Sequence, residues 1–163
     1  MHSTDWSRPR RALGAAVAGT TLAAGLGFAA APTAGAAVPA STGLRVVKIA
    51  AKERGTPYLW GGTTTRGFDC SGYVQWVYRR LHKHLPRTSR QQYRATIHIR
   101  ARHARPGDLV FFYRGRSVGK HGRNVYHVAI FAGHHTIWHS PKPGDHVRKG
   151  GIFSNHVKFG RVR

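Results

Sequence analysis

The chain has 163 residues, of which 27 are Lys or Arg and 5 are Asp or Glu, so its formal net charge is +22 at pH 7. This length suits one domain with a modest hydrophobic core. The single cysteine, Cys70, excludes a scaffold of intramolecular disulfides. Such a one-sided charge predicts binding to polyanions and exceeds what solubility requires, although charge alone also allows nucleic acid as a partner.

The first 37 residues are typical of a cleaved secretory signal peptide. They begin with a basic segment containing Arg8, Arg10 and Arg11, continue with an Ala- and Gly-rich apolar stretch, and reach a small-residue motif at 34–36. About twenty apolar residues would also suffice for a membrane anchor, but the small-residue motif favours cleavage. We therefore expect export, by the general or the twin-arginine route, and a secreted protein at the cell wall or outside the cell.

The folded part is expected to begin with a helix. Residues 44–54 form an apolar pattern that predicts a helix ending at Gly55, and G-T-P-Y-L-W-G-G over 55–62 predicts an irregular loop. The chain is therefore divided into a signal peptide over 1–37, a linker over 38–43 and one folded domain over 44–163.

The only cysteine stands where a second helix is predicted to begin. Asp69 is a good N-cap residue, and the apolar positions after it recur at helical spacing to about His84, before Pro86 stops the helix. Cys70 then lies in the first turn, where the helix dipole favours a thiolate. We expect a lowered thiol pKa and a nucleophilic sulfur. The alternative is that a lone cysteine is only a small buried apolar residue.

The rest of the chain is predicted to form a short helix, capped by Thr88 or Ser89, and then antiparallel strands. Basic segments over 94–105 and 114–124 predict exposed connections. Helices followed by antiparallel strands indicate the α+β fold class. The runs that predict strands are 109–113, 125–132 and 136–140, with shorter ones near Val147 and over 152–157 and 159–163.

Two of the twelve histidines interrupt predicted strands. Strict alternation places His127 on one face with Val125, Ala129 and Phe131. His139 lies in the next strand, T-I-W-H-S. A buried histidine usually has a structural partner, but a cysteine nucleophile needs a base, and that base needs an orienting group. No metal-ligand spacing such as H-E-x-x-H occurs, so we expect no metal and no cofactor.

The most specific signal is the order of several sequence blocks. These are G-T-P-Y-L-W-G-G, F-D-C-S-G-Y-V-Q-W-V-Y, L-P-R-T-S-R-Q-Q, P-G-D-L-V-F-F, and H-V-A-I-F-A-G with I-W-H-S. Their order and spacing resemble the NlpC/p60 family of cell-wall cysteine peptidases, over about residues 46–140. The resemblance implies a papain-like α+β domain in which the cysteine helix packs on an antiparallel sheet. It implies that residues 44–163 form the catalytic domain.

The resemblance also implies roles for individual residues. Cys70 corresponds to the nucleophile, His127 to the general base and His139 to the orienting residue. Tyr58 corresponds to a tyrosine that helps to polarise the scissile carbonyl, together with the backbone N–H of Cys70. Two further positions, which contact the amino end of the substrate in some members, correspond to Asp69 and Ser71.

The expected function is therefore that of a secreted peptidoglycan hydrolase. The resemblance suggests cleavage between D-isoglutamate and diaminopimelate or lysine in stem peptides. Anionic wall polymers are expected to bind the basic surface, no specific nucleic acid is expected, and a monomer is expected. Two alternatives remain: a cationic wall-binding protein with a vestigial site, and an N-acetylmuramoyl-L-alanine amidase or a toxin delivered to competitors.

Overall fold

The computed structural model describes residues 40–163, so the predicted signal peptide lies outside the described residues. The helices are α1 (Ala40–Lys52), α2 (Cys70–Arg79) and α3 (Ser89–Ala95), with the single 3-10 turns η1 (Ala101–His103) and η2 (Lys120–Gly122). The strands are β1 (Thr63–Thr64), β2 (Gly67–Phe68), β3 (Ile97–Ile99), β4 (Leu109–Tyr113), β5 (Val125–Gly133), β6 (Thr136–His139), β7 (Arg148–Gly151) and β8 (Val157–Arg161). Within this part of the chain, no helix has the length and apolar character needed to cross a membrane.

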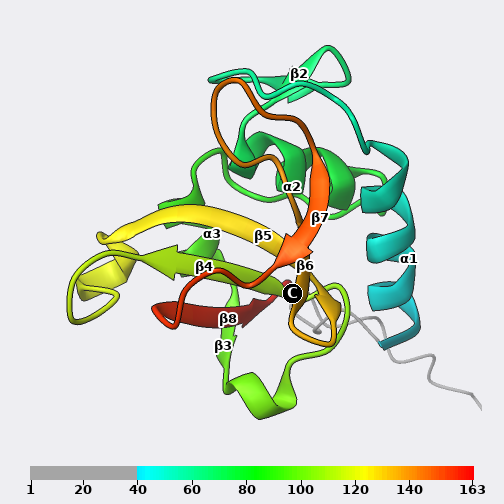
Figure 1. Cartoon of the computed structure of the whole chain (residues 1–163). Coiled ribbons are helices and arrows are strands. Elements are labelled where there is room, and N and C mark those ends of the chain that lie inside the picture. Colours follow the sequence, from blue (N-terminus) through cyan, green and yellow to red (C-terminus); the bar gives the residue numbers. More distant parts are fainter. Residues whose placement is uncertain (1–39) are drawn as a thin grey trace, which may run out of the picture. The chain divides into compact units, whose positions relative to one another are not determined.

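Six strands form one sheet in the order β3-β8-β4-β5-β6-β7, and each neighbouring pair is antiparallel (Figure 1). The short strands β1 and β2 form a separate hairpin between α1 and α2. The helix that begins with Cys70 packs against β5, and α1 packs against β5 and β6. The predicted α+β class and the packing of the cysteine helix on an antiparallel sheet are thus confirmed.

The sheet is apolar on both faces. On the face toward the helices, Phe111, Val128 and Ile130 pack in one cluster with Val74 and Val77 of α2. The other face carries a smaller cluster formed by Val110, Phe112, Ala129, Ile137 and Phe159. Burial on both sides stabilises the central strands, since apolar surface removed from water contributes about 25 cal/mol per Å².

The limits of the first two helices differ from the sequence-based expectation. α1 begins at Ala40, so the last residues of the predicted linker are helical, and Gly43 is buried against the backbone of Pro106. α2 ends at Arg79 rather than near His84. The chain leaves the helix at His82, whose φ of 56° is left-handed. The helix therefore ends before Pro86 can influence it.

α3 begins as predicted, with Thr88 as its N-cap. The Thr88 hydroxyl accepts a hydrogen bond from the backbone N–H of Gln91, and the Gln91 side chain accepts one from the Thr88 N–H in return. This reciprocal capping box satisfies donors that an uncapped helix would leave free.

The strand predictions hold for β4, β5 and β6, and the strand predicted over 159–163 overlaps β8. The strand predicted over 152–157 is wrong, because 152–156 are not in a strand, and three further short elements differ from the expectation. β3 lies within a segment predicted to be only an exposed connection, and it pairs with β8. The hairpin β1–β2 falls in a Gly- and Thr-rich stretch for which no strand is predicted. β7 pairs with β6 although its sequence is R-K-G-G.

A bulge in β5 changes which side chains share a face. Phe112 pairs with His127, whereas the next residue, Tyr113, pairs with Val125, so Tyr126 has no partner on β4. Val125 therefore joins the cluster under the helices, whereas Ala129 lies in the cluster on the other face. The prediction from strict alternation that the two residues share a face is wrong.

A buried ion pair joins the C-terminal strand to the turn before β4. The Arg161 Nε and Nη2 atoms donate to the two Asp108 carboxylate oxygens at 2.8 and 2.7 Å. Asp108 also accepts the Arg105 backbone N–H at 2.7 Å. The side chains of Arg161 and Asp108 are only 11% and 5% exposed, so either charge alone would be costly.

We expect Arg161→Gln to lower the free energy of unfolding by about 3 kcal/mol, because it leaves the Asp108 carboxylate buried without its counter-ion. Urea denaturation followed by circular dichroism measures this loss. Arg163→Gln, at an exposed neighbouring position, is the matched control and should change stability by less than about 0.5 kcal/mol. Equal effects of the two substitutions would contradict the assigned role of the ion pair.

Candidate active site

The N-terminus of α2 carries the cysteine where the sequence predicts it. Asp69 is the N-cap, with an extended backbone, and its Oδ1 atom accepts the Gly72 N–H at 2.7 Å. Cys70 is the first residue of the helix and is a free, partly buried thiol. Its own N–H is not used in helical bonding, as expected in a first turn.

The Asp69 carboxylate does more than cap the helix. Its Oδ2 atom accepts the Gly61 N–H at 3.1 Å from the W-G-G loop, and its Oδ1 atom accepts the Ser71 hydroxyl at 3.2 Å. The Arg87 guanidinium donates to both carboxylate oxygens, and its Nη1 atom also donates to Ser71 Oγ at 3.0 Å. A carboxylate offers about four lone-pair sites, so the protein alone occupies all of them.

Gln92 holds the loop that carries Arg87 against α2. Its Nε2 atom donates to the carbonyl oxygens of Ser71 and Pro86, each at 2.9 Å, and the side chain is fully buried. Arg87 and Gln92 thus fix the first turn of α2 from the opposite side.

A close backbone contact fixes the distance between α2 and the W-G-G loop. A Cβ atom at Gly72 would lie 2.0 Å from the Gly62 carbonyl oxygen. Only glycine allows this approach. The Asp69 N–H donates to the same Gly62 oxygen at 3.1 Å.

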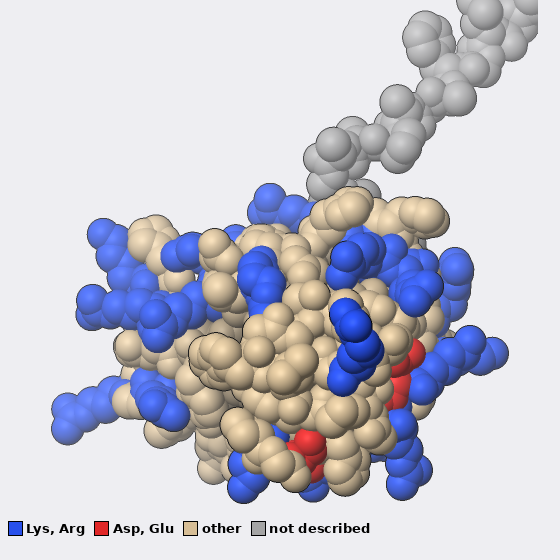
Figure 2. Space-filling model, turned by 90° about the horizontal axis from the view of Figure 1, so that it is seen from above, with Lys and Arg blue, Asp and Glu red and all other residues tan. Residues whose placement is uncertain are grey.

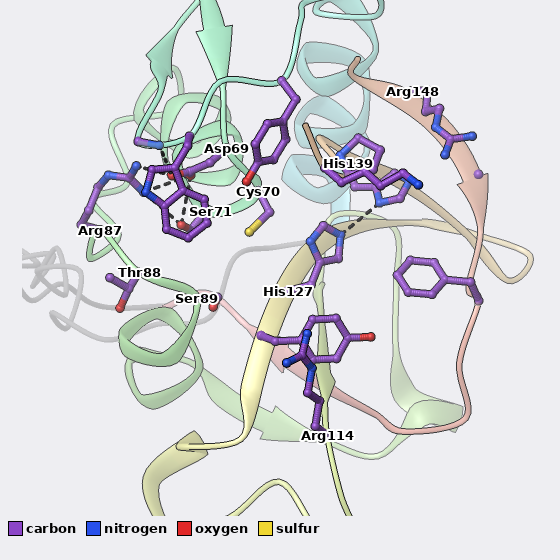
Figure 3. Close-up of a pocket in the computed structure, with 18 of the residues that line it drawn as sticks. Asp69, Cys70, Ser71, Arg87, Thr88, Ser89, Arg114, His127, His139 and Arg148 are labelled. Atoms are coloured by element: carbon purple, nitrogen blue, oxygen red, sulfur yellow. Dashed lines mark hydrogen bonds and ion pairs between the residues drawn. The ribbon is translucent and has the colours of Figure 1, made fainter. Parts of the chain in front are cut away.

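The two strand histidines meet in the structure. His127 Nε2 and His139 Nδ1 lie 3.0 Å apart, and both residues are buried, with exposed fractions of 5% and 4%. In Figure 3 the Cys70 sulfur points toward the His127 ring. If His127 Nε2 carries the proton and donates it to His139, then His127 Nδ1 remains as an unprotonated base. The geometry therefore suits a nucleophile, a base and an orienting group in series.

Burial keeps both imidazoles neutral. The pKa of His127 falls to about 3, first because the ring is desolvated and then because His139 lies beside it. The pKa of His139 falls to about 4, through desolvation and the nearby charge of Arg148. At neutral pH no imidazolium is therefore available beside the sulfur.

The pKa of the Cys70 thiol is raised rather than lowered. Burial raises the pKa of Cys70, and the charge of Asp69 raises it further, although hydrogen bonds from the Val128 and Ser71 backbones oppose this. Desolvation of the thiolate thus outweighs the hydrogen bonds that would stabilise it. The expectation of a lowered pKa, which counted only the helix dipole, is wrong for this structure.

Tyr58 remains a phenol at neutral pH. Burial, followed by the charges of Cys70 and Asp69, raises its pKa. Its backbone is held on two sides, since its N–H donates to the Asp145 carbonyl at 2.8 Å and the residue bridges to Phe68. The side chain can therefore serve as a hydrogen-bond donor in the cleft.

All six residues predicted for the site line one cleft of about 920 Å³, namely Tyr58, Asp69, Cys70, Ser71, His127 and His139. The sequence did not identify several other lining residues, which are Trp60, Arg114, Tyr126, Lys142, Arg148 and Phe153. The exposed ring of Phe153 stacks on Phe112 at 4.2 Å between centroids and lies 5.9 Å from His139. Trp60 belongs to the same sequence block as Tyr58 and could have been found from it, whereas Tyr126 and Arg148 reach the cleft on strands β5 and β7 and no local motif marks them.

Over residues 40–163, no group of three or more His, Cys, Asp and Glu side chains is arranged to hold a metal ion. The cleft offers nitrogen, sulfur and hydroxyl groups suited to acyl transfer by side chains alone.

Comparisons with known proteins agree with this site. The bifunctional muramidase/DL-endopeptidase CwlT of Bacillus subtilis is 39% identical over 125 residues, which is 72% of this chain and 36% of that protein. The probable endopeptidase p60 of Listeria monocytogenes is 37% identical over 120 residues, 72% of this chain and 23% of that protein. The chain thus spans about a third or less of these two relatives.

A solved structure shows the same likeness in three dimensions. The NlpC/p60 domain of the peptidoglycan hydrolase SagA superposes with a TM-score of 0.64 and 34% sequence identity, over 74% of this chain and 98% of that one. Residues 55–159, from the W-G-G loop to β8, match the NlpC/P60 family. Both the fold and the sequence blocks that carry the cleft are therefore shared, and the chain belongs to the NlpC/P60 family.

Proposed function

We propose that this chain is a secreted cysteine peptidase that hydrolyses stem peptides of peptidoglycan with a triad of Cys70, His127 and His139. The observation that carries the proposal is the alignment of the sulfur, the His127 ring and His139 in one cleft (Figure 3). The names of CwlT as a DL-endopeptidase and of SagA as a peptidoglycan hydrolase support this substrate class. The name DL-endopeptidase is consistent with the proposed bond between D-isoglutamate and diaminopimelate or lysine.

Acylation begins with a neutral pair. The Cys70 sulfur attacks the amide carbonyl as His127 Nδ1 takes the thiol proton, so charge forms only as the new S–C bond does. The raised thiol pKa and the lowered His127 pKa both disfavour an ion pair before substrate arrives. His139 accepts the His127 Nε2–H and so holds the base in the required tautomer.

The tetrahedral intermediate needs donors for its oxyanion. The free N–H of Cys70 is one, and the neutral phenol of Tyr58 is the second. His127 then returns the proton to the leaving amine. A water molecule, deprotonated by His127, hydrolyses the thioester and restores the thiol.

The acyl half of the substrate is proposed to lie along Asp69 and Ser71. Both residues line the cleft beside the nucleophile. Because Arg87 and backbone donors occupy the Asp69 carboxylate, a substrate amine contacts it only by displacing one of them. Ser71 Oγ donates to Asp69 and accepts from Arg87, so it keeps one lone pair for a substrate donor.

Charge suggests how a domain of this size stays near its substrate. Figure 2 shows Lys and Arg side chains spread over the face seen from above, with few acidic side chains between them. Such a surface attracts anionic wall polymers over several ångströms. We therefore propose that the exported protein accumulates at the cell wall through its own catalytic domain.

Substitutions of the triad test the reaction. We expect Cys70→Ala to abolish the release of muropeptides and His139→Ala to lower kcat/KM about 100-fold, because a positioning group contributes less than the nucleophile. His139→Asn keeps an acceptor near the position of Nδ1 and should recover part of the activity. His135→Asn, in the exposed turn of the same hairpin, is the matched control.

Mass spectrometry of the digested peptidoglycan gives both rate and product. Release of lactoyl-free stem peptides would identify an amidase, whereas cleavage within the stem identifies an endopeptidase. Turnover retained by Cys70→Ala would exclude the proposed nucleophile, and an inactive but folded wild type would favour the vestigial site.

The protonation of the thiol is tested by alkylation. We expect the rate of iodoacetamide labelling of Cys70 to rise with pH through a midpoint above that of an unstructured cysteine peptide, because burial raises the thiol pKa. The unstructured peptide is the reference, and it is labelled at the same ionic strength as the protein. A midpoint below that of the peptide would mean that a thiolate is already formed in the free enzyme.

Binding to anionic polymers is tested with purified cell walls. We expect binding of Cys70→Ala to weaken strongly between about 0.1 and about 1 M NaCl, which shortens the Debye length from about 10 Å to about 3 Å. Replacing Arg116, Lys120 and Arg123 in the exposed loop by Gln should weaken binding further. Walls stripped of teichoic acid are the control. Equal binding to stripped walls at every salt concentration would contradict the proposal.

A further inference from the structure

The cleft has two differently charged sides around Cys70 (Figure 3). On one side, the charge of Arg87 is cancelled by its ion pair with Asp69. On the other side, Figure 3 shows Arg148 beyond His139 and Arg114 below His127, at separate positions on the rim, and Lys142 also lines the cleft. We call Arg114, Lys142 and Arg148 the basic wall.

The basic wall keeps a net positive charge. Asp145 pairs with Arg148, with Nη2 to Oδ2 at 3.0 Å, and it is the only acid paired with any of the three within residues 40–163. Asp145 is not among the residues that line the cleft. The Arg114 guanidinium lies 4.9 Å from the centroid of the Tyr126 ring, which holds it at the rim without neutralising it.

Strand pairing fixes Arg148 next to the catalytic pair. Arg148 on β7 is directly opposite His139 on β6, so both side chains project from the same face. Two residues along, Gly150 has no side chain, and a Cβ atom there would lie 3.6 Å from His139 Nε2. The surface of β7 beside the histidines therefore stays open to a ligand.

The chemistry decides which half of the substrate meets this wall. The base that accepts the thiol proton returns it to the leaving amine, so that amine lies on the His127 side of the scissile carbonyl. The residue that follows the cleaved bond then extends past His139 toward Arg148. This step rests on the function proposed above.

We propose that the basic wall is a carboxylate-binding subsite for the residue after the cleaved bond, and that it selects diaminopimelate over lysine. The two side chains differ at the end: diaminopimelate carries a carboxylate beside its amine, whereas lysine carries the ammonium alone. A carboxylate beside His139 gains a charge-assisted hydrogen bond from Arg148, and Arg114 and Lys142 add to the positive charge around it. A lone ammonium group meets like charges and gains none.

Binding tests the subsite without requiring turnover. Three N-acetylmuramoyl stem peptides differ only in the third residue, which is diaminopimelate, diaminopimelate with its side-chain carboxylate amidated, or lysine. Calorimetry with Cys70→Ala should give a Kd about tenfold lower for the free carboxylate than for either of the other two peptides, as expected for a hydrogen-bonded charge. Adding Arg114→Gln and Arg148→Gln should bring the three Kd values within about twofold. Arg100→Gln, exposed and outside the cleft, should leave the preference intact.

Cleavage by the otherwise wild-type enzyme gives the second readout. The ratio of kcat/KM between peptides is the quantity compared, because an altered His139 changes all three rates together while loss of the subsite changes the ratio. Equal affinities in Cys70→Ala, or a preference unchanged by removing both arginines, would overturn the subsite. Selective binding with no cleavage of any peptide would support the subsite and overturn the proposed peptidase.

Discussion

The Asp69 carboxylate is the point on which the geometry of the cleft depends. It joins three segments that are distant in the sequence: the W-G-G loop through Gly61, the first turn of α2 through Gly72, and the loop before α3 through Arg87. Each bond positions a different lining residue of the cleft relative to the sulfur. Hydrogen bonds to an ionised carboxylate are stronger than those between neutral groups. Asp69 therefore stabilises the arrangement of these segments by more than an N-cap hydrogen bond alone would. Loss of this carboxylate would leave the partly exposed Arg87 guanidinium without its counter-ion and the N–H groups of Gly61 and Gly72 without their acceptor.

Desolvation governs the electrostatics of the nucleophile and its base. Hydrogen bonds from Val128 and Ser71 favour a thiolate and burial disfavours it, and burial is the larger effect on the pKa of Cys70. The same burial keeps His127 and His139 neutral. The thiol and both imidazoles therefore stay neutral until substrate binds and excludes water. This suits a proton transfer that is coupled to bond formation.

The sequence predicted those parts of the fold whose signals are local. The N-cap at Asp69, the capping box at Thr88 and the apolar run of β4 all depend on neighbouring residues, and all are confirmed. The family resemblance brought together residues that local patterns leave far apart, and each of them lines the cleft. The end of α2 could not be predicted from the sequence. The helix ends in a turn in which His82 has a left-handed backbone and the Tyr78 carbonyl accepts hydrogen bonds from the turn, and no Pro or Gly stands there to indicate it.

Elements that depend on long-range pairing escaped prediction. β7 has the sequence R-K-G-G, which has a low strand propensity, and it is a strand only because β6 offers a free edge. The position of Arg148 in the basic wall follows from that pairing and so has no sequence motif. The bulge at Tyr126 is likewise a property of two strands in register, and it places His127 off the face of Val125.

The contact between Gly72 and the Gly62 carbonyl oxygen links catalysis to how the chain tolerates insertions. Because α2 rests on the loop backbone with no side chain between them, the loop cannot lengthen at Gly62 without moving the nucleophile. The tip of the β1–β2 hairpin is instead exposed, at Thr64, Thr65 and Arg66. New binding segments can therefore be grafted at this tip, beside the cleft, while the distance between Tyr58 and Cys70 stays fixed.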